Sequence, residues 1–235
     1  MMRGSTARAA CAVLLALVVT GCGHSSAPTV DRVRHASGHA SDRPIPLTAV
    51  QAPLPLTPAQ EVTRVGLRSG EIPSVQRVRW PAAGRSAVGP TLAFCPATGS
   101  SDRHRVARRT VIAAAPHSHV VYADQTLVYD SAASARTAFD QVRRVVAACA
   151  DGMPRRVPGA TGLPVAPSYT ARFTTGRPGV TSQVLLVAQQ RGDVLDVLTV
   201  TSPRPVASAR QRLLLREAGA TGRRLARLPL ASTGT

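Results

Sequence analysis

The most regular hydrophobic pattern in the chain predicts a helix that begins after Asp130 or Ser131. Its apolar residues recur at the spacing of one helical face, which indicates that this face is buried. Gly152 is placed to end the helix. The apolar stripe comprises Ala135, Ala138, Phe139, Val142, Val145, Val146 and Cys149, and the opposite, solvated face carries Arg136, Asp140, Arg143 and Arg144.

Alternating or continuous apolar runs predict strands on both sides of this helix. We expect a strand over residues 109–115 and one or two over 120–129, with a turn near Asp124. Residues 169–175 alternate with period two, and a hairpin follows with arms 183–190 and 193–201 and a turn at Arg191-Gly192. Both arms are rich in Val and Leu, which predicts a central place in a sheet.

Weaker signals predict helices near both ends of the folded region. Thr57 and Gln60 have the spacing of a capping box, so a short helix should begin there and end at Gly66 or Gly70. Residues 205–218 predict an amphipathic helix that stops at Gly219, and residues 221–228 add a third, short one. The pattern favours one α+β domain over residues 57–235.

The N-terminal residues have the features of a bacterial lipoprotein signal. Arg3 and Arg8 flank the start of an apolar run over 9–19, about half of the ~20 residues that a membrane-spanning helix needs. Val19-Thr20-Gly21-Cys22 resembles a lipobox, which predicts a signal peptide over 1–21 and a lipid on Cys22. An ordinary secretory signal with a chance cysteine is the alternative. Repeated prolines over 22–56 predict a tether that holds the domain at the outer face of the cell membrane.

Composition narrows the function further. All 29 basic residues are Arg, and the absence of Lys excludes a P-loop, a Schiff-base enzyme and Ser-x-x-Lys chemistry. Removal of Arg3 and Arg8 with the signal leaves 27 basic against 12 acidic residues, a net charge of +15. Because the protein is exported, its Arg residues are scattered and its aromatic residues are few, we expect anionic lipids or acidic wall polymers as partners and no nucleic acid.

No local motif predicts catalysis or a cofactor. His117 and His119 could share a metal ion from one face of a strand, with His104 as the nearest third ligand, but the adjacent Pro116 favours a turn with exposed histidines. Asp193 and Asp196 are expected at the hairpin turn and at a solvent-facing strand position, respectively. We expect no cofactor and no catalytic residues.

The four cysteines divide by position. Cys11 leaves with the signal peptide and Cys22 takes the lipid, so Cys95 and Cys149 remain in an oxidising compartment, where a pair normally bonds. We therefore predict a Cys95–Cys149 disulfide, with two unconnected buried thiols as the alternative.

The run LVYDSAASARTAFDQVRRVVAACADG, with LAFC upstream and the hairpin VLLVAQQRGDVLDVLTVT downstream, resembles the PknH-like extracellular sensor domain family. The resemblance covers residues 57–230 and implies a curved, mainly antiparallel sheet with two or three packed helices, a ligand cleft and an extracellular ligand. The chain departs from the family in having cysteines for one domain disulfide instead of two, and in lacking a Trp beside Cys149. No cleft residue is transferred from the family.

These observations favour a lipid-anchored extracytoplasmic module that binds a small molecule or an envelope partner without catalysis. A structural lipoprotein that docks on the cell wall or on a membrane partner is the first alternative. A secreted hydrolase with a Ser-His-Asp triad scattered along the chain is the second.

Overall fold

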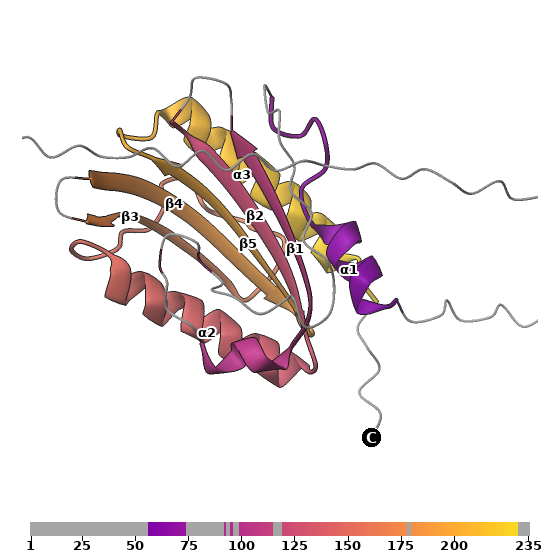
Figure 1. Ribbon diagram of the computed structural model, residues 1–235. Coiled ribbons are helices and arrows are strands. Elements are labelled where there is room, and N and C mark those ends of the chain that lie inside the picture. Colours follow the sequence, from indigo (N-terminus) through magenta and orange to yellow (C-terminus); the bar gives the residue numbers. More distant parts are fainter. Residues whose placement is uncertain are drawn as a thin grey trace, which may run out of the picture. The chain divides into compact units, whose positions relative to one another are not determined.

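Five antiparallel strands form one curved sheet in the order β1-β2-β5-β4-β3 (Figure 1). The computed structural model describes residues 56–73, 92, 95, 99–114, 119–177 and 180–229. The α+β class, the antiparallel sheet and the packed helices are as predicted. The strands are β1 Arg105–Ala114, β2 Val121–Tyr129, β3 Ser168–Arg177, β4 Val180–Arg191 and β5 Val194–Ser202.

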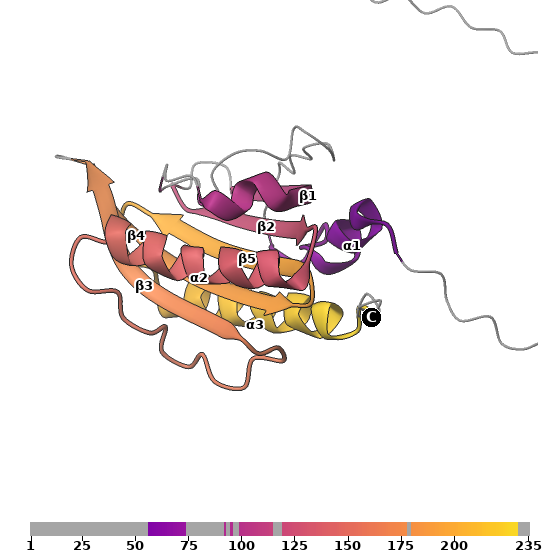
Figure 2. The same cartoon turned by 90° about the horizontal axis from the view of Figure 1, so that it is seen from below.

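Two long helices cover opposite faces of this sheet (Figure 2). Helix α2, Ala132–Cys149, packs through its predicted stripe on one face, with Phe139 and Val142 buried against β2, β4 and β5. Helix α3, Ser208–Ala226, packs on the other face, chiefly through Leu214, Ala218 and Leu225. The short helix α1, Pro58–Val65, lies against β1, β2 and α3, and a 3-10 turn, η2 Ser100–His104, precedes β1.

The capping signals are confirmed at both predicted starts. The Thr57 hydroxyl accepts a hydrogen bond from Gln60 N, and the Gln60 side chain accepts one from Thr57 N, so the capping box is complete. Ser131 caps α2 by accepting a hydrogen bond from Ser134 N at 3.1 Å. Gly152 has a φ of +89°, the left-handed conformation expected just beyond a helix end.

The β4–β5 hairpin is central in the sheet, as predicted, but its turn lies one residue later than predicted. Strands β4 and β5 occupy the two positions next to each other inside the sheet, and Arg191 pairs with Val194. The turn is therefore Gly192-Asp193, with Gly192 at a φ of +57°. A glycine meets this left-handed requirement at low cost.

Two predictions about element boundaries are wrong. Strand β2 runs without a turn at Asp124, which pairs with Val111 and Leu198 on its two neighbours. Helix α3 does not stop at Gly219; it continues through Gly222 as one helix, so the separate third helix over 221–228 is not formed. The reason is packing: Gly222 lies directly against the buried Gln189 side chain of β4, where an added Cβ would be 2.3 Å from Gln189 Oε1.

The two domain cysteines are joined as predicted. The disulfide links Cys95 to Cys149 at the end of α2, with the Cα atoms 6.1 Å apart. Cys95 is fully buried and lies in the core between α2 and the sheet. No helix within the described ranges is long and apolar enough to cross a membrane. The predicted signal, Cys22 and the tether lie outside the described residues.

Candidate functional site

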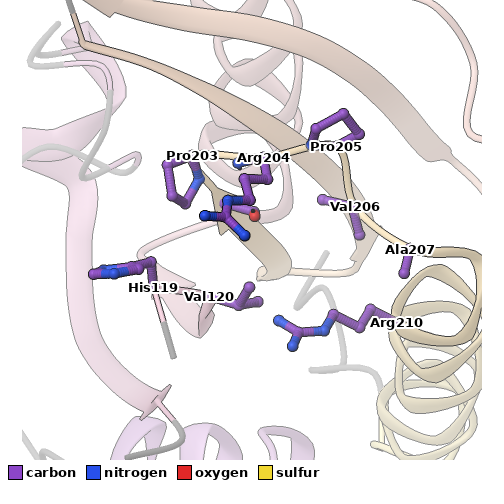
Figure 3. A pocket seen from close by; sticks show the side chains of 9 residues that line it. His119, Val120, Pro203, Arg204, Pro205, Val206, Ala207 and Arg210 are labelled. Atoms are coloured by element: carbon purple, nitrogen blue, oxygen red, sulfur yellow. Dashed lines mark hydrogen bonds between the residues drawn. The ribbon is translucent and has the colours of Figure 1, made fainter. Parts of the chain in front are cut away.

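A basic pocket lies where β2 begins, β5 ends and α3 begins. It has a volume of about 460 Å³, within the usual range for small-molecule sites. Figure 3 shows the guanidinium groups of Arg204 and Arg210 pointing into the space beside Val120, with His119 at the rim. The lining residues are His119, Val120, Ser202, Pro203, Arg204, Pro205, Val206, Ala207 and Arg210.

The loop that carries Arg204 is held by the sheet beneath it. The Ser202 hydroxyl accepts a hydrogen bond from Arg204 N at 3.2 Å, and Gln183 Oε1 accepts one from Val206 N at 2.6 Å. Pro203 and Pro205 restrict the backbone on both sides of Arg204. The pocket wall is thus ordered before any ligand arrives, which lowers the entropic cost of binding.

The charge in this pocket is positive and lacks a balancing carboxylate. Neither Arg204 nor Arg210 is within ion-pair distance of an acidic side chain in the described part of the chain, and no acidic residue lines the pocket. Ala207, the residue that caps α3, makes no side-chain capping bond, and it lines the pocket, so the start of a 19-residue helix borders this space without a side-chain cap. A helix N-terminus adds partial positive charge. The site is suited to an anion.

The charge of Arg210 also acts on the phenol of Tyr122 on β2. Burial raises the pKa of Tyr122, and the nearby charge of Arg210 opposes that rise. Tyr122 is nearly buried on the α3 face of β2, so its hydroxyl stays protonated at neutral pH and remains a hydrogen-bond donor.

The histidine cluster that was weighed as a metal site, and not favoured, is not assembled within the described ranges. His119 is exposed at the pocket rim, while His117 lies outside the described residues. His104 is engaged elsewhere: its Nδ1 lies 2.7 Å from Asp130 Oδ2. No group of three or more His, Cys, Asp or Glu side chains in that part of the chain could hold a metal ion.

The His104–Asp130 pair does not have the arrangement of a hydrolase triad. A triad places a serine hydroxyl at Nε2 of the histidine, opposite the carboxylate. Here Arg103 Nε donates to His104 Nε2 at 3.1 Å, and Ser131 instead donates to Asp130 Oδ1 at 3.2 Å. Hydrogen bonds from Ser134, His104 and Ser131 lower the pKa of Asp130, so its side chain is a carboxylate at neutral pH.

A pair of carboxyl groups lies in the interior, on the α3 face of the sheet. Asp124 and Asp196 are 0% and 1% exposed, so the expectation that Asp196 faces solvent is wrong. Asp124 Oδ2 accepts a hydrogen bond from Leu67 N at 2.6 Å, and Asp196 Oδ1 accepts one from the Thr126 hydroxyl at 3.1 Å. The two carboxyls lie beside each other, and since the pKa of both is raised, the pair keeps a proton through which one can donate to the other.

The proton on this pair is held by its surroundings. Burial, followed by the charge of Asp196, raises the pKa of Asp124 well above its usual value. Burial also raises the pKa of Asp196. Arg109 partly opposes the shift on Asp124. Two carboxyls that share a proton resemble an acid–base dyad, but a ligand has no access to fully buried groups, and their role is structural.

A second pair of acidic groups lies near the hairpin turn. Glu61 on α1 is 6% exposed, and burial together with the charge of Asp193 raises its pKa to about 7. Burial likewise raises the pKa of Asp193, which is at the turn as predicted. Like the buried pair, these groups contribute to pH-dependent stability and line no described pocket.

The two arginines of the pocket were not predicted from the sequence. The signal that could have found them is Pro203-Arg204-Pro205 before a helix whose cap, Ala207, has no polar side chain. No sequence signal predicts that His119, just before β2, lines this pocket, because only the pairing of strands in the folded sheet brings it there. Sequence reasoning did single out His119, but for a metal site.

No known family's sequence profile matches this chain, and no curated protein matches it. Among solved structures, the chain is similar to the extracellular domain of PknH from Mycobacterium tuberculosis, with a TM-score of 0.49 and 12% sequence identity. The match covers 72% of this chain and 97% of that one.

Proposed function

We propose that the protein is a lipid-anchored extracytoplasmic binding module, without catalytic activity, that captures a small anionic molecule in the pocket of Arg204 and Arg210. The observation that carries this proposal is the convergence of two guanidinium groups without carboxylate partners and an uncapped helix start on one pocket. Phosphate or carboxylate groups fit such a site because they accept several charge-assisted hydrogen bonds at once.

The lipobox-like segment and the overall charge support the proposed location. A mature protein that is tethered through Cys22 and carries a net charge of +15 is attracted to anionic lipids and acidic polymers. That attraction concentrates the domain where anionic ligands are present. This attraction acts on any anion, whereas the pocket gives the bound anion a defined position.

The pocket is tested by removing its charges. Arg204→Gln combined with Arg210→Gln should lower the affinity for glycerol 3-phosphate at least about tenfold, since each charge-assisted hydrogen bond contributes about 1.5–3 kcal/mol. Isothermal titration calorimetry of the purified protein measures it. The charge-matched control is Arg136→Gln combined with Arg144→Gln, two exposed arginines on α2. An equal loss in both double variants would show general electrostatic attraction and contradict the pocket.

The anchor is tested separately. Cys22→Ala should release the protein into the medium or leave its signal uncleaved, because two acyl chains give stable anchoring at about 0.8 kcal/mol per buried methylene and none remains. Cell fractionation with N-terminal mass analysis measures both outcomes. Normal processing and unchanged membrane association in the variant would refute a lipid on Cys22.

The alternative of docking on acidic wall polymers has one observation in its favour. A second basic hollow of about 340 Å³ lies beside β3, and its lining includes Arg155, Arg156 and Tyr169. Tyr169 also lies under the Arg143 guanidinium, 5.8 Å from ring centroid to Cζ. Binding of purified wall polymer that survives loss of Arg204 and Arg210 would favour this alternative over the anion pocket.

A further inference from the structure

An apolar hollow of about 270 Å³ lies on the face of the sheet that carries α2, beyond the part that α2 covers. Its floor is made by cross-strand rows of β1, β2 and β5, of which Ile112, Ala123 and Thr199 form the middle one. It is lined by Leu92, Ile112, Val121, Ala123, Gln125, Val197, Thr199 and Thr201.

The hollow exists because Ala123, at its centre, is small. Helix α2 packs over Leu186 and Ala188 on β4 and over Leu127 on β2, at the other corner of this face. At the open corner Ala123 leaves space that a larger side chain would fill, and it is only half-buried, as is Ile112. The surface there is suited to a hydrocarbon group.

One polar side chain in this hollow has no partner. Gln125 is 5% exposed, and its buried Oε1 accepts no hydrogen bond in the described part of the chain. The nearby Thr199 hydroxyl donates to Ala123 O at 3.2 Å instead. A buried amide oxygen that accepts no hydrogen bond is costly and rare, so its presence needs an explanation.

Three other buried side chains with an unpartnered atom, those of Gln189, Asp124 and Asp196, are enclosed by the fold. Gln189 lies against Gly222, and its Nε2 donates to Ala218 O at 2.8 Å. Asp124 and Asp196 share a proton. Gln125 differs from these because it lines an open hollow, where a ligand can reach its amide.

We propose that this hollow binds a short aliphatic molecule that carries an amide group, with the amide hydrogen-bonded to Gln125 and the chain over Ala123. A side-chain amide offers both donors and an acceptor, and another amide complements both at once. The small volume limits the ligand to less than drug size. This site is separate from the basic pocket, and a neutral ligand does not depend on Arg204 or Arg210.

The test uses octanamide and methyl octanoate as probes. The ester accepts hydrogen bonds but donates none, so octanamide should bind about tenfold more tightly. Binding to the purified protein is followed by NMR of labelled isoleucine methyl groups. Ile112 should shift, whereas Ile72, which is buried in the cluster on the α3 side, serves as the internal reference.

Two variants separate the polar and apolar parts of the site. Gln125→Leu should remove the preference for octanamide, lowering its affinity at least about tenfold, while methyl octanoate, which loses only an accepted hydrogen bond, should weaken less. Ala123→Leu should block both probes by filling the hollow, and Thr201→Leu serves the same purpose if that variant fails to fold. No Ile112 shift at saturating octanamide, equal affinity for the two probes, or unchanged octanamide affinity in Gln125→Leu would each overturn the proposal.

Discussion

Replacing both domain cysteines with alanine, Cys95→Ala and Cys149→Ala, is expected to lower the free energy of unfolding by about 4 kcal/mol. The disulfide closes a loop with a sequence separation of 54, and such a loop restricts the unfolded chain by about that amount in the chain-entropy model. Since a domain has a net stability of about 5–15 kcal/mol, this is a large share. Urea denaturation followed by circular dichroism measures the loss.

Reductant provides the control for this prediction. Dithiothreitol should move the unfolding midpoint of the unmodified protein toward that of the double variant, and it should leave the double variant unchanged. Free thiols in the folded, exported protein, or a midpoint that reductant does not move, would contradict the disulfide's role. The effect belongs to stability alone, because Cys95 is fully buried in the core.

The parts of the fold that sequence predicts best are those where one local pattern decides the structure. The stripe on α2 and the cap at Ser131 determine the helix and its buried face without help from distant residues. The arms of the β4–β5 hairpin were predictable for the same reason, since a glycine-containing turn joins two apolar runs.

The errors arise where a distant partner overrides a local signal. Glycine normally weakens a helix, but α3 continues because Gly222 allows contact with Gln189 on another element. Aspartate normally favours a turn, yet Asp124 remains inside a strand because Leu67 N and Asp196 satisfy it. Leu67 and Asp196 are 57 and 72 residues away from Asp124 in the sequence, so no local pattern reveals these contacts.

The candidate site was less predictable than the fold. Its positive charge is visible in the composition, but the pocket needs three chain segments that meet only in the folded sheet: 119–120, 202–207 and Arg210. The second hollow depends on which corner of the sheet α2 leaves open, a packing outcome with no local pattern.

Asp124→Ala is expected to lower the free energy of unfolding by about 3–5 kcal/mol, the range for removing one partner of a buried ion pair, here with Arg109. Asp124 anchors the segment after α1 by accepting from Leu67 N, and it lies beside Arg109, which donates to Leu67 O at 2.6 Å. A Cβ on Gly66 would lie 2.9 Å from Asp124 Oδ2, so the segment packs directly on this carboxyl. Its loss leaves a buried N–H and a buried guanidinium without the carboxylate.

Asp196→Asn, in contrast, is expected to raise the stability of the protein, by an amount that depends on pH. Both acids have pKa values in the folded state that are above their unfolded value of about 3.9. The stability that their shared proton supplies is therefore complete below about pH 3.9. It is lost as the pH rises through the pKa values of the folded state. An asparagine amide donates to Asp124 without needing that proton. The stability of the variant relative to the unmodified protein should therefore rise between pH 6 and 8.5, by up to about 1.4 kcal/mol per pH unit for one proton.

Urea denaturation at several pH values measures the relative stability of Asp196→Asn directly. Glu61 and Asp193 also titrate with raised pKa values, but they are present in both proteins and cancel in the difference. Asp140→Asn, on the solvated face of α2 with its carboxyl 44% exposed, is the matched control and should give a difference independent of pH. If the Asp196→Asn difference is equally flat, the two carboxyls do not share a proton. If the stability difference depends on pH for Asp196→Asn but not for Asp140→Asn, the protein takes up a proton when it folds. The cause is that two neighbouring strands place their carboxyl groups together where water cannot reach them.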